Sequence, residues 1–81
     1  MPDLAYWRKS GDKRVMRKIS LLLDSIRKDY QNGLGQPEKL KGNFTGCWSR
    51  RINKKDRIIY YVSHDDNTVY ILSLRGHYLE K

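Results

Sequence analysis

The chain has 81 residues, 38% of them hydrophobic, and 17 lysines and arginines against 9 aspartates and glutamates give it a formal charge of +8. This length predicts a single domain spanning residues 1–81, which buries only about 60% of its unfolded surface. One cysteine, Cys47, excludes an internal disulfide and a cysteine-rich zinc site. Without a long apolar run or a signal-peptide pattern, we expect a cytoplasmic protein with no membrane span, no cofactor and no metal.

The positive charge favours a polyanion or an acidic protein as partner. Two Trp, six Tyr and one Phe are interleaved with the basic residues. Stacking on bases and neutralisation of phosphates are therefore available together, which favours contact with nucleic acid. The alternative is a domain that is merely basic.

Two helices are predicted in the first third of the chain. Residues 3–9 are predicted to be a short helix or the tail of a longer one, which Ser10-Gly11 ends, and Asp12 is placed to cap the next helix. This second helix has about five turns and ends at Asn32-Gly33-Leu34-Gly35. Its apolar stripe consists of Val15, Met16, Ile19, Leu22, Leu23, Ile26 and Tyr30. Its other face is basic, and either simple solvation or the tracking of phosphates explains that face.

Three strands are predicted in the second half, over residues 47–52, 57–63 and 68–75, because Tyr, Ile, Val and Thr dominate these runs. Residues 36–46 before them are rich in turn formers and predict a loop. The expected fold class is α+β, with N-terminal helices packed on a twisted antiparallel sheet. The helices cover one sheet face and leave the other for function.

Alternation along the predicted strands assigns side chains to the two faces. Trp48, Arg50 and Ile52 share one side, whereas Arg51 lies on the other. A hairpin register that sets Arg51 opposite Arg57 makes them cross-strand neighbours. Like charges placed opposite each other are destabilising, so such a pair indicates an anion between them. A register shifted by one residue separates the pair.

The ordered motifs of the second half resemble the YoeB/Txe branch of the RelE/ParE superfamily of bacterial toxins, and the likeness extends over nearly the whole chain. The matching positions are Gly35, Pro37-Glu38, Leu40-Lys41, Gly46, Trp48-Ser49-Arg50-Arg51-Ile52, Arg57 and His77-Tyr78. The resemblance implies a RelE-like, microbial-RNase-like fold. It also implies a ribosome-dependent endoribonuclease that cleaves mRNA in the ribosomal A site without a metal.

The resemblance assigns catalytic roles to four residues. Glu38 falls on the family's general base, Arg57 on its transition-state arginine, His77 on its general acid and Tyr78 on the ring that positions or stacks the substrate. The residue types suit the chemistry, because a base, a cation and an acid are what cleavage by a 2'-hydroxyl requires. Each residue also has a non-catalytic interpretation. Glu38 could be a loop carboxylate paired with lysine, Arg57 a charge on an edge strand, and His77 a residue of a flexible tail.

Lys41 and Arg51 fall on basic family positions that contact RNA near the scissile bond. The implied products are a 2',3'-cyclic phosphate and a free 5'-hydroxyl. The implied partners are mRNA, the ribosome, an acidic antitoxin of the YefM/Phd type, operator DNA only through the antitoxin complex, and a second copy in a homodimer. His64 lies in an acidic turn and is expected to be solvated without a role, and Trp48 is expected in the sheet core.

The chain departs from the family pattern at both ends. It opens inside the family's first helix, so the usual first strand is expected to be absent. Leu79-Glu80-Lys81 follow Tyr78, whereas the matching Tyr is the last residue in similar family members. Two alternatives therefore stay open: a non-catalytic inhibitor like the ParE branch, and an inactive partner that only binds antitoxin or DNA.

Overall fold

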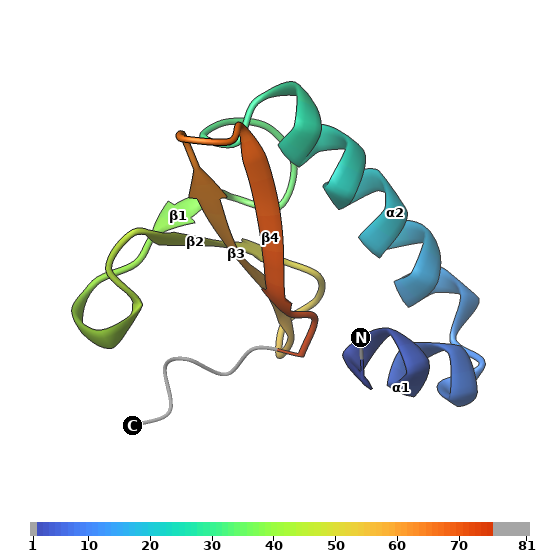
Figure 1. Ribbon diagram of the computed structural model, residues 1–81. Coiled ribbons are helices and arrows are strands. Elements are labelled where there is room, and N and C mark those ends of the chain that lie inside the picture. The colour runs from blue at the N-terminus through green and yellow to red at the C-terminus, as the bar shows by residue number, and fades with distance from the viewer. Residues whose placement is uncertain (1, 76–81) are drawn as a thin grey trace.

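The computed structural model describes residues 2–75, and two helices and a four-stranded sheet make up its fold (Figure 1). The helices are α1 (Pro2–Ser10) and α2 (Lys13–Lys28). The strands are β1 (Glu38–Lys39), β2 (Cys47–Arg51), β3 (Arg57–Ser63) and β4 (Thr68–Ser73). They pair in chain order, each antiparallel to the next. This architecture confirms the predicted α+β class.

Helix α2 begins where the sequence predicts it, because the Asp12 side chain accepts a hydrogen bond from the Val15 backbone N–H at 3.1 Å. Its buried residues follow helical spacing and are Val15, Ile19, Leu22 and Ile26. The predicted length of about five turns was too long. The helix ends at Lys28, so Tyr30 belongs to the turn that follows rather than to the helical stripe.

Both helices lie on one side of the sheet, and α2 runs along it (Figure 1). The main core forms in that layer between α2, Trp7 of α1 and the inward-facing residues of β3, among them Ile58 and Tyr60. The Trp7 indole N–H also donates to the Leu74 carbonyl at 2.9 Å, which ties α1 to the end of β4. Trp48 packs against this core, as predicted.

Residues 36–46 were predicted to be a loop, and this was partly wrong. They contain the two-residue strand β1 and a 3₁₀ turn, Gly42–Phe44. A strand of two residues has no alternation for sequence patterns to detect. It exists because β2 supplies its partner: Glu38 pairs with Ser49, and the Leu40 N–H donates to the Cys47 carbonyl at 3.0 Å.

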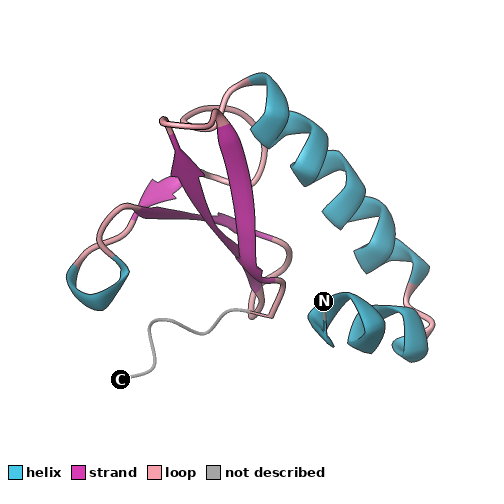
Figure 2. Ribbon diagram, viewed as in Figure 1, coloured by secondary structure: helices cyan, strands magenta, loops and turns pink. Residues whose placement is uncertain are grey.

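The sheet face away from the helices is called the open face below. Its residues include Glu38, Ser49, Arg51, Arg57, Ile59, Tyr61 and Tyr70. The 3₁₀ turn lies on this side (Figure 2). A second small apolar cluster of Leu40, Cys47 and Ile59, with Phe44 packed against it, joins that turn to the sheet. Cys47 is therefore a buried filler, as predicted.

Across residues 2–75, neither helix combines the length and apolar character that crossing a bilayer demands.

Candidate functional site

Arg51 and Arg57 are direct cross-strand partners at the start of the β2–β3 hairpin. The register that the sequence left open is therefore the one that makes them neighbours. Arg51 is exposed and Arg57 is half-buried. Directly opposite side chains on an antiparallel pair have Cβ atoms about 5 Å apart, so two cationic side chains leave the sheet side by side here. An anion bound between them would neutralise both charges.

Glu38 lies on the same open face, one strand further out. It pairs with Ser49, and Arg51 is two residues beyond Ser49, so Glu38 and Arg51 are diagonal neighbours about 7–8 Å apart at the backbone. Both side chains are exposed. Lys41 is also exposed and immediately precedes the 3₁₀ turn that follows β1. The sheet thus brings a carboxylate and two arginines together from three strands.

Two buried polar atoms lie within this part of the open face. Ser49 Oγ and Arg57 Nη1 have no hydrogen-bond partner among residues 2–75. Ser49 is only 1% exposed. Buried polar groups are nearly always bonded, and an unsatisfied one costs about 1–3 kcal/mol. A ligand oxygen at this point would satisfy the arginine N–H.

His77 and Tyr78 lie outside the described residues. The chain that leads to them leaves the sheet next to Arg57, because Ser73 at the end of β4 pairs with Ile59. The last described residue, Arg75, places its guanidinium 3.7 Å from the centre of the Tyr6 ring in α1.

Arg50 is a structural cation that the sequence did not single out. It is fully buried, and all five of its N–H groups have neutral oxygen acceptors. The acceptors are Tyr60 Oη (3.0 Å), Ser25 Oγ (2.7 Å), Leu34 O (3.1 Å), Asp29 O (2.6 Å) and Asn32 O (2.9 Å). The one signal in the sequence was its position between Trp48 and Ile52, because alternation places Arg50 on the same side of the strand as these two apolar residues.

This set of bonds, the Arg50 cage, holds the turn after α2 against β2. The cage requires glycine at two positions. A Cβ on Gly33 would lie 2.3 Å from Ser25 Oγ, and a Cβ on Gly35 would lie 2.7 Å from Leu22. Gly35 in turn accepts a hydrogen bond from the Arg51 backbone N–H at 2.7 Å. The cage therefore fixes the segment that runs directly into β1 and Glu38.

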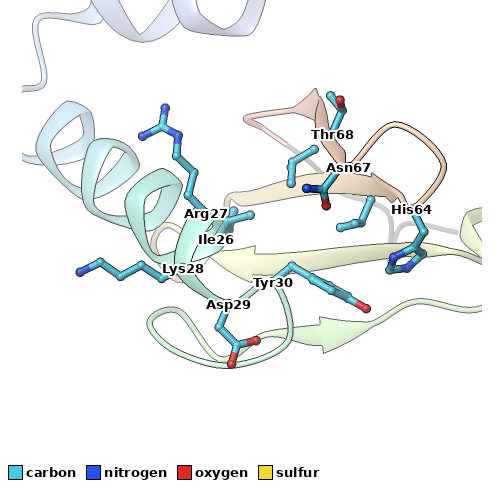
Figure 3. Close-up of a pocket in the computed structure, with 10 residues that line it drawn as sticks. Ile26, Arg27, Lys28, Asp29, Tyr30, His64, Asn67 and Thr68 are labelled. Atoms are coloured by element: carbon cyan, nitrogen blue, oxygen red, sulfur yellow. The ribbon is translucent and has the colours of Figure 1, made fainter.

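A hollow of about 620 Å³ lies elsewhere, between the end of α2 and the β3–β4 turn (Figure 3). Tyr30 and His64 extend toward one another there, with ring centres 5.6 Å apart. His64 is exposed, as predicted, but it is not simply solvated because it packs against this ring. No predicted site residue lines the hollow. It is therefore separate from the open face.

Among the described residues, no three His, Cys, Asp or Glu side chains gather closely enough to hold a metal ion. The chemistry that the open face offers is that of a carboxylate and cations.

The sequence profile of the YoeB-like toxins of bacterial type II toxin–antitoxin systems matches residues 1–78. The chain belongs to this family. The Toxin YoeB of a Synechocystis species is 42% identical over 72 residues, covering 89% of this chain and 81% of the relative. The Toxin YoeB of Escherichia coli K12 is 41% identical over 76 residues, covering 94% of this chain and 87% of the relative.

Solved structures of YoeB proteins share the fold. A YoeB/ParE toxin from Agrobacterium tumefaciens superimposes with a TM-score of 0.88 at 36% identity, over 95% of this chain and 88% of that one. The heterotetrameric YoeB–YefM complex from Staphylococcus aureus contains a chain with a TM-score of 0.77 at 43% identity, over 90% of this chain and 83% of that one. The YoeB dimer from the same organism gives 0.76 at 43% identity, with the same coverage. The expected RelE-like fold of this YoeB-family chain is thus confirmed.

Proposed function

We propose that this YoeB-family toxin is a ribosome-dependent endoribonuclease that cleaves mRNA in the ribosomal A site by metal-independent acid–base catalysis. The observation that carries the proposal is the Arg51–Arg57 pair on the open face, with an Arg57 N–H that has no hydrogen-bond partner within residues 2–75. Two adjacent cations and a free donor suit a phosphate diester. Glu38, on the same face, supplies a base within reach of that phosphate.

Each group has one step in the reaction. Glu38 removes the proton of the ribose 2'-hydroxyl, and the 2'-oxygen attacks the phosphorus. Arg57 stabilises the negative charge that grows on the phosphate oxygens. His77 gives a proton to the departing 5'-oxygen, so the bond to that oxygen breaks without releasing an alkoxide. The products are a 2',3'-cyclic phosphate and a 5'-hydroxyl.

Three further residues act on binding. Lys41 and Arg51 contact RNA phosphate near the scissile bond, and Tyr78 positions or stacks the substrate. Cationic contacts of this kind supply affinity that falls as salt rises.

The proposed protein partner is an acidic antitoxin of the YefM type. A YoeB relative forms a heterotetramer with YefM, and YoeB from the same organism forms a dimer. The formal charge of +8 on this chain favours an acidic partner. We further propose homodimerisation, binding to operator DNA only through the antitoxin complex, and action in the cytoplasm, where mRNA is translated.

The test is a primer-extension assay on an mRNA translated by purified ribosomes. Replacing Glu38 by Gln removes the base and keeps the shape, so cleavage is expected to slow by about 10²-fold or more. Lys39→Gln is the matched control. Lys39 is the next residue of β1 and pairs with Trp48, so its side chain points to the other side of the sheet. This variant is expected to cleave at close to the parental rate.

Equal cleavage by the parent and the Glu38→Gln variant would refute the role of the base. The two alternative functions give different results. An inhibitor like ParE would block DNA supercoiling by purified gyrase and leave the mRNA intact. An inactive partner would leave the mRNA intact, spare gyrase and still bind antitoxin.

A further inference from the structure

Two tyrosines form an exposed aromatic pair on the open face. Tyr61 of β3 and Tyr70 of β4 are cross-strand partners, and their rings stack with centres 6.4 Å apart and planes 29° apart. They are 42% and 45% exposed, although they are large apolar side chains. The Tyr70 hydroxyl donates to the Asp66 carboxylate at 2.8 Å, which holds its ring in place. Within residues 2–75, neither α1 nor α2 covers this face, and the 3₁₀ turn lies over part of it (Figure 2).

The tyrosine pair lies on the same face of the sheet as the candidate site, on the far side of the buried cluster of Leu40, Cys47 and Ile59. Arg57, Ile59 and Tyr61 alternate along β3 and point to the same side. At about 3.3 Å per residue, Tyr61 is about 13 Å from Arg57 along the strand. A strand of RNA whose phosphate lies at the arginine pair can therefore place a nearby base over the rings.

We propose that Tyr61 and Tyr70 form a stacking platform for an unpaired nucleobase next to the scissile phosphate. This inference rests on the proposed endoribonuclease function, because it takes the anion at Arg51 and Arg57 to be an RNA backbone. Aromatic residues on an exposed antiparallel sheet stack the bases of single-stranded RNA in unrelated RNA-binding domains. The platform is a positioning and affinity site, and no bond is made or broken there.

The charges around the platform favour a base over an acidic protein segment. Asp65 and Asp66 lie in the β3–β4 turn at its edge, and both are exposed. Asp66 is ionised at neutral pH, and hydrogen bonds from Ser63 and Tyr70 lower its pKa further. An acidic segment would be repelled here. A nucleobase is neutral, and its phosphates can extend toward the arginines at the other end of β3.

The test measures binding of a short single-stranded RNA that carries 2'-fluoro groups, which remove the attacking hydroxyl and prevent cleavage. Fluorescence anisotropy compares Tyr61→Leu and Tyr70→Leu with Tyr61→Phe and Tyr70→Phe. Leucine keeps apolar area but loses the ring, whereas phenylalanine keeps the ring. Loss of a base stack is expected to weaken binding by about 5- to 150-fold, and the phenylalanine variants are expected to stay within about twofold of the parent.

A second readout is photocrosslinking of the same RNA with 5-iodouridine at successive positions, which is expected to label Tyr61 or Tyr70 at one position. The platform is refuted if the leucine variants bind RNA as tightly as the parent and no crosslink forms. It is also refuted if the parent protein binds no RNA. Leucine variants that bind RNA normally but lose affinity for a YefM-type antitoxin assign the surface to a protein and overturn the proposal as well. A different result refutes the proposed endoribonuclease function, namely cleavage of mRNA by the Glu38→Gln variant at the parental rate.

Discussion

Replacing Arg50 by Met tests how much of the fold depends on one buried cation. Methionine fills much of the same volume but makes none of the five hydrogen bonds of the Arg50 cage. Three backbone carbonyls near the end of α2 then lose their donor. An unsatisfied buried group costs about 1–3 kcal/mol, so we expect a loss of at least about 3 kcal/mol in the free energy of unfolding.

That loss is large for this protein. A domain of 81 residues has a total stability of about 4–12 kcal/mol. The urea midpoint, followed by circular dichroism, should therefore fall sharply in the Arg50→Met variant. Arg50→Lys should lose at least about 2 kcal/mol, because an ammonium keeps the charge but cannot form the five-donor fork.

Arg51→Met is the matched control, since it makes the same substitution one residue away at an exposed position. Exposed substitutions stay within about 0.5 kcal/mol, so its midpoint should remain near that of the parent. Equal losses in Arg50→Met and Arg51→Met would refute the cage as the cause. An Arg50→Lys variant as stable as the parent would show that a positive charge, without the five hydrogen bonds, is enough to stabilise the fold.

Two further predictions concern the turns. Gly35→Ala should lower the free energy of unfolding by about 2 kcal/mol or more, because φ is +81° and the new Cβ would lie 2.7 Å from Leu22. Gly42→Ala should lower it by only about 1 kcal/mol, because φ is +65° but no atom lies within 4 Å of the new Cβ. Equal urea midpoints for the two variants would contradict this steric explanation. Hydrogen bonds from Ser63 and Tyr70 lower the pKa of Asp66 in the folded protein below its ordinary value of 3.8. Ionised Asp66 therefore stabilises the fold fully above pH 3.8, and this contribution is lost as the pH falls through the pKa of the folded protein. In the Asp66→Asn variant, the free energy of unfolding should fall less steeply as the pH is lowered into the acid range. The same steepness as in the parent would refute a contribution from this carboxylate.

Local patterns predicted most of the elements. The N-cap Asp12 and the stripe from Val15 to Ile26 located α2, and β3 spans the residues that its Ile, Tyr and Val content indicated. These signals lie within one element, where side-chain periodicity reports directly on which face is buried. The end of α2 was placed too late because Tyr30 continues the apolar spacing beyond Lys28.

Part of the candidate site was accessible in the same way. Alternation gave the side of each strand on which Arg51 and Arg57 lie and left open the register that pairs them, and the resemblance selected Glu38. The sequence could not show that Glu38 belongs to a strand, because β1 has two residues and exists only through its pairing with β2. It could not show the Arg50 cage either, because the acceptors are 10 to 25 positions away from Arg50 in the chain, four of them in residues 25–34 and the fifth at Tyr60.

The sequence by itself determined the approximate positions of the two helices and of β2, β3 and β4, the alternation of side chains along those strands, and the family. Only the tertiary structure decided which side chains meet. It chose the hairpin register that sets Arg51 against Arg57, brought Glu38 beside them, and stacked Tyr61 on Tyr70. The reason is that periodicity is a property of one segment, whereas register and burial of polar groups depend on how segments pair and on where their hydrogen bonds can be satisfied.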